Sequence, residues 1–277
     1  MSAVDSDLAY QPHPNCDTPA DDAVLWRYMD FARFVDLLVS KSLWLSRLDR
    51  LDDPREGLLT EREYDRLTKK PDGMATSVER LRSLSYVNCW HQADCESMAM
   101  WDLYGAGASG IAIKTITGAI KTAIAGTACP IYISGVKYID WKQYDEDTQN
   151  AIGIGVRKAE GYRQEHEVRL LYWKPETEPV RVPGEAADSG ASINVEAFSQ
   201  EVTVALAGFL RRVDFTTVNI SQLVFRLILE HRYRDWLRNE PPGISVSIDT
   251  AALIDEVVVG PRAQSWIEAR SHRGQAV

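Results

Sequence analysis

Two glutamates two positions apart, Glu165 and Glu167, are the residues best suited to chemistry, and Arg169 follows at the same spacing. Apolar side chains alternate with them over residues 168–172, a period of two that predicts a β-strand with both carboxylates and the guanidinium on one face. Two carboxylates in that arrangement can hold a ribose hydroxyl, stabilise a developing cation or polarise a nucleophile. The same pattern is also typical of a solvated sheet face whose charges pair across strands. The spacing alone therefore leaves a chemical and a structural interpretation open.

Arg27 is a candidate for binding an anion. It lies within a strand expected over residues 24–28, between the large apolar side chains of Trp26 and Tyr28. An arginine in such a position is costly unless it is paired with a carboxylate or binds an anion. Both outcomes stay open, and in a structural ion pair the carboxylate would come from the strand that carries the two glutamates.

Further carboxylates occur in the turn-like segment 51–57, which contains Asp52, Asp53 and Glu56. Together with the two glutamates they offer a metal-dependent nuclease centre as an alternative. Two-metal hydrolysis needs converging carboxylates, and it commonly uses a positioned lysine as well. Here Arg169 stands where that lysine would be expected, which weakens the nuclease interpretation.

Two other motif-like stretches do not meet the requirements of the sites they suggest. Cys89, His91 and Cys95 lack a fourth ligand at a spacing that a structural zinc site would need, so we expect no metal. The glycines of residues 105–110 match a dinucleotide fingerprint in letters, but an expected helix precedes them and an expected strand follows. A genuine fingerprint follows a strand and opens a helix, so these glycines predict a tight turn.

Strands and helices interleave without the regular alternation of a doubly wound sheet. This order predicts an α+β fold with a mixed, largely antiparallel sheet and flanking helices. We expect strands at residues 24–28, 43–46, 85–90, 111–114, 131–133, 136–138, 163–173, 244–248 and 254–259, and helices at 31–38, 58–67, 98–104, 117–125, 143–158, 195–213 and 220–238.

The domain organisation follows from composition. Residues 1–22 are rich in Asp and Pro without periodicity, which predicts a disordered or loosely docked tail. Residues 23–277 are expected to form a single α+β domain with a helical insertion at about 193–240, which follows a Pro- and Gly-rich stretch.

The bulk composition limits the partners and the compartment. The 277 residues carry 31 basic and 40 acidic side chains, a formal net charge of −9, which argues against non-specific binding to duplex DNA. Apolar stretches are too short for a membrane span, and no secretory signal is visible. Four scattered cysteines do not make a disulfide framework. We therefore expect a cytoplasmic protein, with a protein partner or a homo-oligomer left open.

Seven segments form a set that points to a family. The first four are an opening strand at residues 25–28, a second strand at 43–46, an acidic turn at 52–56 and a cysteine-bearing strand at 89–91. The other three are a Met-Trp helix with a following glycine at 100–110, the Glu-x-Glu strand at 165–169 and a closing strand at 254–261 that ends in Gly-Pro. As a set they resemble the bacterial family known as domain of unknown function 2971. The chain departs from it at His91 and Val168, where the family has Ser and Trp.

The layout also resembles that of ADP-ribosyltransferases, more remotely. That resemblance implies NAD as the substrate, with Arg27 holding its pyrophosphate. It implies that Glu167 stabilises the oxocarbenium ion as nicotinamide departs, while Glu165 orients the acceptor. The positions that it implies for the nicotinamide pocket are Trp44, Ser46 and Tyr104, and Tyr28 is a further candidate for binding the cofactor.

The resemblances together predict an NAD-dependent ADP-ribosyltransferase-like enzyme, or an NAD glycohydrolase, that acts in bacterial antiphage defence or as a toxin. The alternative from a different class is a non-catalytic binding or regulatory domain, in which Arg27 and the two glutamates pair with one another. A cleft lined by Arg27, Tyr28, Trp44 and Glu167 would favour the enzyme, and a filled sheet face without a cleft would favour the binding domain.

Overall fold

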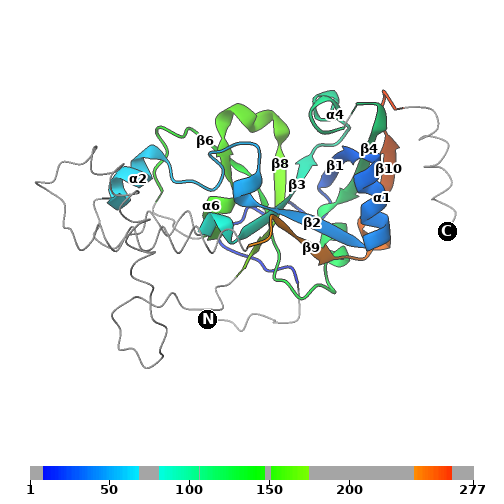
Figure 1. The fold of residues 1–277 in the computed structure, drawn as a ribbon, viewed down its shortest axis with the longest axis horizontal. Coiled ribbons are helices and arrows are strands. Elements are labelled where there is room, and N and C mark those ends of the chain that lie inside the picture. The colour runs from blue at the N-terminus through cyan, green and yellow to red at the C-terminus, as the bar shows by residue number, and fades with distance from the viewer. Residues whose placement is uncertain (1–8, 69–80, 106, 147–150, 175–239, 264–277) are drawn as a thin grey trace, which may run out of the picture. The chain divides into compact units, whose positions relative to one another are not determined.

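The computed structural model of the chain describes residues 9–68, 81–105, 107–146, 151–174 and 240–263 (Figure 1). Contacts divide the chain into two units, residues 1–174 with 240–277, and residues 175–239. Only the first unit contains described residues. The expected helices at 195–213 and 220–238, and with them the insertion at about 193–240 apart from Glu240, lie outside the described residues.

The described part is α+β, as the sequence predicts. Its strands are β1 (Val24–Asp30), β2 (Ser42–Arg47), β3 (Ser85–Gln92), β4 (Gly110–Ile116), β5 (Tyr132–Gly135), β6 (Lys137–Ile139), β7 (Arg157–Ala159), β8 (Glu167–Trp173), β9 (Gly243–Ser247) and β10 (Glu256–Val259). Its helices are α1 (Phe31–Ser40), α2 (Glu61–Thr68), α4 (Met98–Tyr104), α5 (Thr117–Ala123), α6 (Ala151–Gly155) and α9 (Thr250–Leu253), with short 3-10 helices η1 (Leu48–Arg50), η2 (Gly107–Ser109) and η3 (Glu160–Glu165). Whether the core is that of an ADP-ribosyltransferase stays a prediction.

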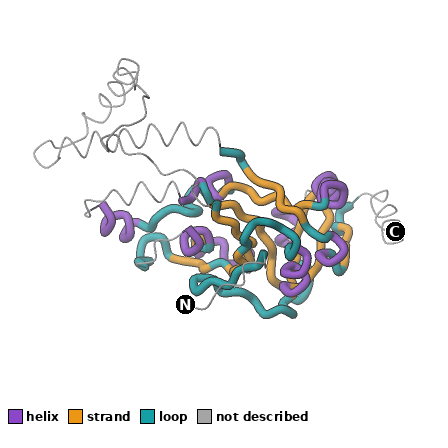
Figure 2. The backbone as a smooth tube through the Cα atoms, turned by 90° about the horizontal axis from the view of Figure 1, so that it is seen from below, coloured by secondary structure: helices purple, strands orange, loops and turns teal. Residues whose placement is uncertain are grey.

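Within the described residues, eight strands form one antiparallel sheet, and β6 and β7 form a separate parallel pair. The main path runs β10-β4-β1-β3-β2-β9, while β8 pairs with β3 and β5 pairs with β8. The strands occupy the middle of this unit, with helices and loops around them (Figure 2). Figure 1 shows α1 and α4 toward one end and α2 toward the other.

The strand β3 divides the sheet. One of its edges pairs with β8 from Ser85 to His91. Its other edge is shared, because β2 pairs with Tyr86 and Val87 while β1 pairs only with His91 and Gln92. Residues 88–90 therefore face no strand on this edge, and β1 and β2 separate there.

Side chains take over hydrogen bonds at this separation. The Asn88 side chain donates from Nδ2 to the carbonyl oxygen of Trp44 at 2.8 Å, and Arg27 donates from Nη1 to the carbonyl oxygen of Cys89 at 3.5 Å. Backbone carbonyls that have no sheet partner need other donors. The separation thus brings polar side chains together between two strands.

Alternation along β1 explains how Arg27 comes to be partly buried. Leu25 and Met29 belong to the large hydrophobic core, whereas Trp26 and Tyr28 belong to a second cluster that packs under α4. With a period of two, Arg27 shares the face of Leu25 and Met29. The helix that follows begins as expected, because Asp30 accepts a hydrogen bond from the backbone N–H of Arg33 at 2.8 Å.

Residues 1–22 were expected to be disordered or loosely docked, and residues 9–22 are docked against the sheet. Ala9 is buried, the hydroxyl of Thr18 donates to the carbonyl oxygen of Ile133 at 2.7 Å, and the backbone N–H of Asp17 donates to Ser134 Oγ at 2.9 Å. The edge of β5 that faces away from β8 supplies these partners, so the segment satisfies an otherwise open sheet edge. Residues 1–8 lie outside the described part.

The helix predicted over residues 143–158 is also wrong in its extent. Only Ala151–Gly155 is helical within the described residues of that range, and Arg157–Ala159 forms β7. Residues 157–159 pair with β6 and are therefore a strand. Arg157 forms an ion pair with Glu63, and Lys158 forms ion pairs with Glu165 and Glu167. Tertiary contacts of this kind override helix propensity.

No helix among the described residues is long and apolar enough to cross a membrane.

Candidate functional site

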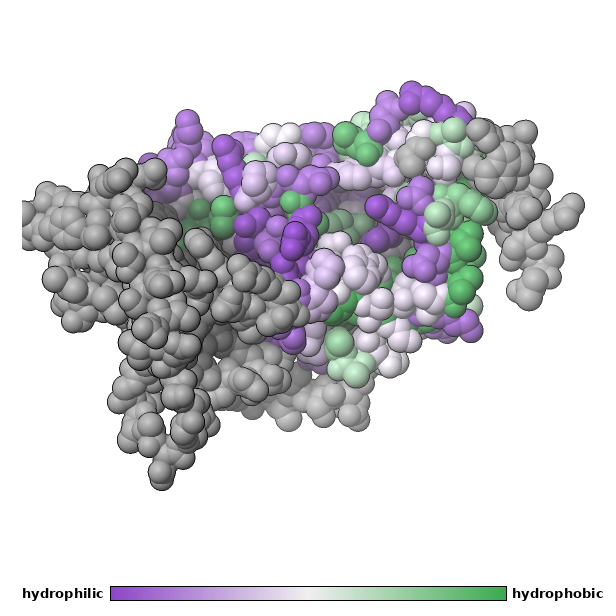
Figure 3. Space-filling view, in the orientation of Figure 1, coloured by the Kyte–Doolittle hydropathy of each residue, from purple (hydrophilic) through white to green (hydrophobic). Residues whose placement is uncertain are grey.

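One cleft, of about 240 Å³, collects the predicted site residues. Its lining includes all seven of them: Arg27, Tyr28, Trp44, Ser46, Tyr104, Glu165 and Glu167. The cleft lies where β1 and β2 separate, with β3 and β8 contributing to its lining, and Figure 3 shows a groove between strongly polar residues on this face. Strands and helices far apart in the sequence thus place the seven side chains at one site, although their chemical roles stay predictions.

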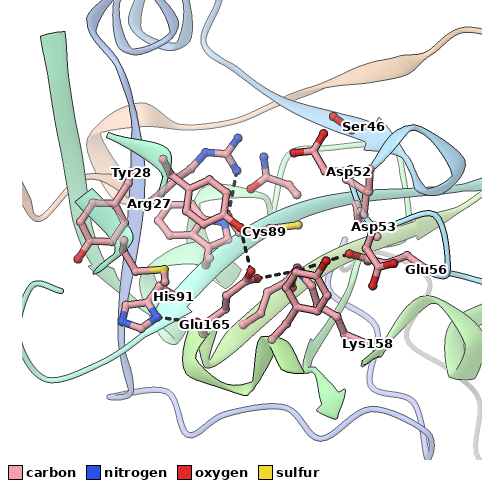
Figure 4. Close-up of a pocket in the computed structure, with 18 of the residues that line it drawn as sticks. Arg27, Tyr28, Ser46, Asp52, Asp53, Glu56, Cys89, His91, Lys158 and Glu165 are labelled. Atoms are coloured by element: carbon pink, nitrogen blue, oxygen red, sulfur yellow. Dashed lines mark hydrogen bonds and ion pairs between the residues drawn. The ribbon is translucent and has the colours of Figure 1, made fainter. Parts of the chain in front are cut away.

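The cleft also contains residues whose place the sequence did not indicate. Four lining residues were not singled out from the sequence: Arg33, Asn88, Lys158 and Tyr162. The lining also includes five residues that the sequence offered for other chemistry, namely Asp52, Asp53, Glu56, Cys89 and His91. Figure 4 shows Arg27 toward one end of the cleft and Glu56 and Lys158 toward the other. A basic end and an end rich in carboxylates thus face the same space.

The two glutamates do not share a strand, contrary to the prediction. Glu165 ends the 3-10 helix η3, His166 adopts a left-handed conformation with φ of 39°, and β8 begins only at Glu167. Lys158 nevertheless brings the two carboxylates together, because its Nζ lies 2.6 Å from Glu165 Oε2 and 3.1 Å from Glu167 Oε2. Their convergence therefore depends on an ammonium group rather than on the strand period.

Five buried charged side chains form what we call the glutamate cluster: Glu56, Lys158, Glu165, Glu167 and Arg169. Arg169 donates to Glu167 from Nε at 2.7 Å and from Nη2 at 3.2 Å, and it also donates to Glu56 Oε2. Lys158 Nζ lies 3.4 Å from Glu56 Oε1. Buried charges persist when they are paired and hydrogen-bonded, and each member of the cluster meets that condition.

The surroundings of the glutamate cluster shift the pKa values of Glu167 and Glu56 in opposite directions. Burial alone would raise the pKa of Glu167, but the charges and hydrogen bonds of Arg169 and the charge of Lys158 outweigh it and lower the pKa to about 2. For Glu56, burial prevails over the attraction of Arg169, and the pKa is raised. Glu167 is thus a permanent carboxylate at neutral pH, beside a carboxyl group that holds its proton more tightly.

Arg27 has a different environment from the arginine of the cluster. Among the described residues it has no carboxylate partner, and its guanidinium lies over the Trp90 ring at 5.8 Å from the centroid. Burial lowers the pKa of Arg27 to about 10, so the guanidinium stays charged at neutral pH. The expected ion pair of Arg27 with Glu165 and Glu167 is not observed, because those carboxylates contact Lys158 and Arg169 instead. The binding or regulatory alternative itself stays a prediction.

Exposed aromatic rings border the cleft. Trp44, Tyr104 and Tyr162 line the cleft and are 48%, 45% and 37% exposed. The Tyr104 hydroxyl donates to Glu165 Oε1 at 3.0 Å, and Lys158 Nζ lies 4.7 Å from the centroid of the Tyr162 ring. These rings present flat faces on which a planar group can stack.

The residues considered for zinc do not form a common site. His91 hydrogen-bonds through Nδ1 to the carbonyl oxygen of Glu165 at 2.6 Å, Cys89 is partly buried, and Cys95 is exposed. Within the described ranges, no group of three His, Cys, Asp or Glu side chains is arranged to hold a metal ion. Three of the carboxylates considered for a nuclease centre, Glu56, Glu165 and Glu167, contact Lys158 or Arg169 in this structure. The nuclease alternative stays a prediction.

No protein-family model, curated protein or solved structure matches this chain. The resemblances described from the sequence therefore remain predictions.

Proposed function

We propose that the cleft binds NAD and transfers its ADP-ribose group to an acceptor. The observation that carries this proposal is the presence, in one cleft, of a guanidinium without a described carboxylate partner and of a permanently ionised glutamate, Arg27 and Glu167. NAD offers the complementary pair of charges, an anionic pyrophosphate and a cationic nicotinamide riboside. The proposal rests on this complementarity together with the resemblance of the layout.

The basic end suits the pyrophosphate. Arg27 is partly buried, and Arg33, whose side chain is 81% exposed, lies at the border of the same cleft. Guanidinium groups donate two parallel hydrogen bonds to phosphate oxygens. A phosphate here would also offset the cost of holding Arg27 away from water without a carboxylate.

The carboxylate end suits the reacting ribose. When the bond between C1′ and the nicotinamide nitrogen breaks, its electron pair leaves with nicotinamide and C1′ becomes cationic. A fixed carboxylate such as Glu167 stabilises that charge without reorganising, and the acceptor then forms the new bond to C1′. Glu165, held by Lys158 and Tyr104, is placed to orient the ribose or the acceptor.

The size of the cleft fits one half of the ligand. Its volume of about 240 Å³ is below the roughly 300–1,000 Å³ of typical small-molecule pockets. Nicotinamide and its ribose would occupy the interior, with Tyr28, Trp44 and Tyr104 beside the planar ring and Ser46 in polar contact. The adenosine half would extend past Arg33.

Release of nicotinamide from NAD tests the proposal. The purified protein should release nicotinamide, and Glu167→Gln should reduce the rate at least about 100-fold because the fixed charge is lost. Glu160→Gln is the control, because Glu160 has an exposed side chain paired with the exposed Arg163 and lies outside the cleft lining. Full activity of Glu167→Gln would contradict the assignment of Glu167. Binding of NAD without release of nicotinamide would support the regulatory alternative.

A cytoplasmic bacterial role in antiphage defence or as a toxin belongs to the same proposal, and it rests on the resemblance.

A further inference from the structure

The glutamate cluster contains one more negative charge than positive charges. Three carboxyl groups, Glu56, Glu165 and Glu167, surround two cations, Lys158 and Arg169, and every one of the five side chains is at most 8% exposed. An unbalanced charge in a buried cluster is costly, and a group of this kind reduces the cost by binding a proton. The arrangement therefore favours one protonated carboxyl group among the three.

The hydrogen bonds indicate which carboxyl group accepts this proton most readily. Glu167 accepts two bonds from Arg169 and one from Lys158 at 3.1 Å. Glu165 accepts from Lys158 at 2.6 Å and from the Tyr104 hydroxyl at 3.0 Å. Glu56 has one bond from Arg169 Nη2, and its distance of 3.4 Å to Lys158 is the longest of the three. Glu56 is therefore the carboxylate that its surroundings stabilise least.

The charged and titratable groups that face Glu56 act in both directions. The positive charges of Arg169 and Lys158 favour its carboxylate form, whereas the negative charge of Glu167 opposes it, and burial is the largest single effect. Burial raises the pKa of the Cys89 thiol on β3, and the negative charges of Glu167 and, to a smaller extent, Glu56 raise it further. The balance raises the pKa of Glu56 and leaves Glu167 ionised.

Glu56 also has access to the space where a reaction would occur. It is part of the cleft lining, and it comes from the turn between Asp53 and Gly57 rather than from a strand. Glu56 and Glu167 share both cations, because Arg169 Nη2 and Lys158 Nζ contact each of them. Two neighbouring carboxyl groups in unequal environments are the usual arrangement of an acid–base partner beside a fixed charge.

We propose that Glu56 is the proton-exchanging group of the cleft and that it takes the proton of a hydroxyl acceptor during transfer of ADP-ribose. This inference rests on the proposed function. The oxygen of the acceptor forms a bond to C1′, and the bond from C1′ to the nicotinamide nitrogen breaks with its electron pair on nicotinamide. The acceptor proton moves to the Glu56 carboxylate and then to solvent, so one proton is released for each turnover.

The proposal selects a class of acceptor. A hydroxyl group, water included, must lose its proton when it becomes an ether or a hemiacetal oxygen, and a general base assists that loss. A carboxylate acceptor carries no proton to lose and would need no such base. Glu56 thus predicts an acceptor that carries a proton on its attacking atom rather than a carboxylate. A hydroxyl group is the acceptor we propose, with hydrolysis of NAD as the simplest case.

Infrared titration tests the protonation of Glu56 without any ligand. The wild-type protein should keep a protonated carboxyl band above the ordinary titration range of glutamate, and Glu56→Gln should lack it. Glu63→Gln is the matched control, because Glu63 is equally buried, pairs with Arg157 at 2.9 Å and lies outside the cleft lining. A band that survives in Glu56→Gln would assign the proton to another group and overturn the proposal.

The pH dependence of nicotinamide release tests the role in transfer. The wild-type rate should rise with pH as Glu56 loses its proton, whereas Glu56→Gln should be at least about 100-fold slower and should lack this rise. Glu56→Asp keeps a carboxyl group and should retain the rise, which a merely structural role would not require. An unchanged pH profile in Glu56→Gln would refute the role of Glu56 as base. If the wild-type protein neither binds nor cleaves NAD, the proposed function fails together with the hydroxyl acceptor, while the infrared titration still decides the protonation.

Discussion

Replacement of Glu167 by glutamine should destabilise the protein in a pH-dependent way. Glu167 accepts two hydrogen bonds from Arg169, which is fully buried, and a third from Lys158. Breaking a buried ion pair typically costs about 3–5 kcal/mol, because the partner keeps its charge. Glu56 continues to neutralise part of Arg169, so we expect the lower end, a loss of about 3 kcal/mol at pH 7.

The pKa of Glu167 gives a second route to this magnitude. A pKa lowered from the ordinary glutamate value of 4.5 to about 2 corresponds to about 3 kcal/mol of stabilisation. Because the pKa is lower in the folded state, this stabilisation is fully present above about pH 5 and is lost as the pH falls toward 2. Glu167→Gln should lack that part of the acid-induced loss.

Urea unfolding between pH 3 and 7 measures both quantities. Glu160→Gln is the reference, because an exposed ion pair contributes less than about 1 kcal/mol. If Glu167→Gln costs less than about 1 kcal/mol at pH 7 and keeps the acid dependence of the wild-type protein, Glu167 does not hold the cluster together as described. The stability loss is expected whether or not the protein is an enzyme, so only turnover distinguishes the two classes of function.

Three further variants follow from the same contacts. Arg27→Met should change the free energy of unfolding by less than about 1 kcal/mol, because no described carboxylate loses its partner; a large loss in urea unfolding would reveal a hidden ion pair. Lys158→Met leaves three carboxyl groups with one cation, so the pKa values of those groups should rise in the folded protein. The variant should therefore gain stability as the pH falls from 8 to 5, and thermal unfolding across that range measures the gain. Deletion of residues 1–22 should cost on the order of 2 kcal/mol, because hydrogen bonds to the edge of β5 are lost; an unchanged melting temperature would contradict the docking of this segment.

The fold class, and the strands that carry several of the candidate residues, could be predicted from local patterns. The large apolar neighbours of Arg27 placed it correctly in a strand, which is β1, and the helix expected from residue 31 is α1, which Asp30 caps. Trp44 and Ser46 lie on a strand that the apolar pattern also indicated. Such patterns report which residues share an element, and here the sheet brings those elements together.

The position of Lys158 could not be predicted in this way. Residues 143–158 have a helical composition, and only pairing with β6 and contact with the glutamates fix Lys158 in a strand. Glu165 was misplaced for a related reason, since the left-handed conformation of His166 interrupts the strand period. Neither feature has a local signature, because both depend on residues far away in the sequence or on a single backbone angle.

Calorimetric titration with NAD tests the central claim most directly. The wild-type protein should bind NAD, and Arg27→Met should lose binding while it unfolds at a similar urea concentration. Arg262→Gln is the control, because it removes an equal charge from an exposed pair with Asp102 outside the cleft. Binding that disappears only in Arg27→Met would place the dinucleotide in the cleft. No binding of millimolar NAD to the wild-type protein, or equal binding to Arg27→Met, would contradict the account.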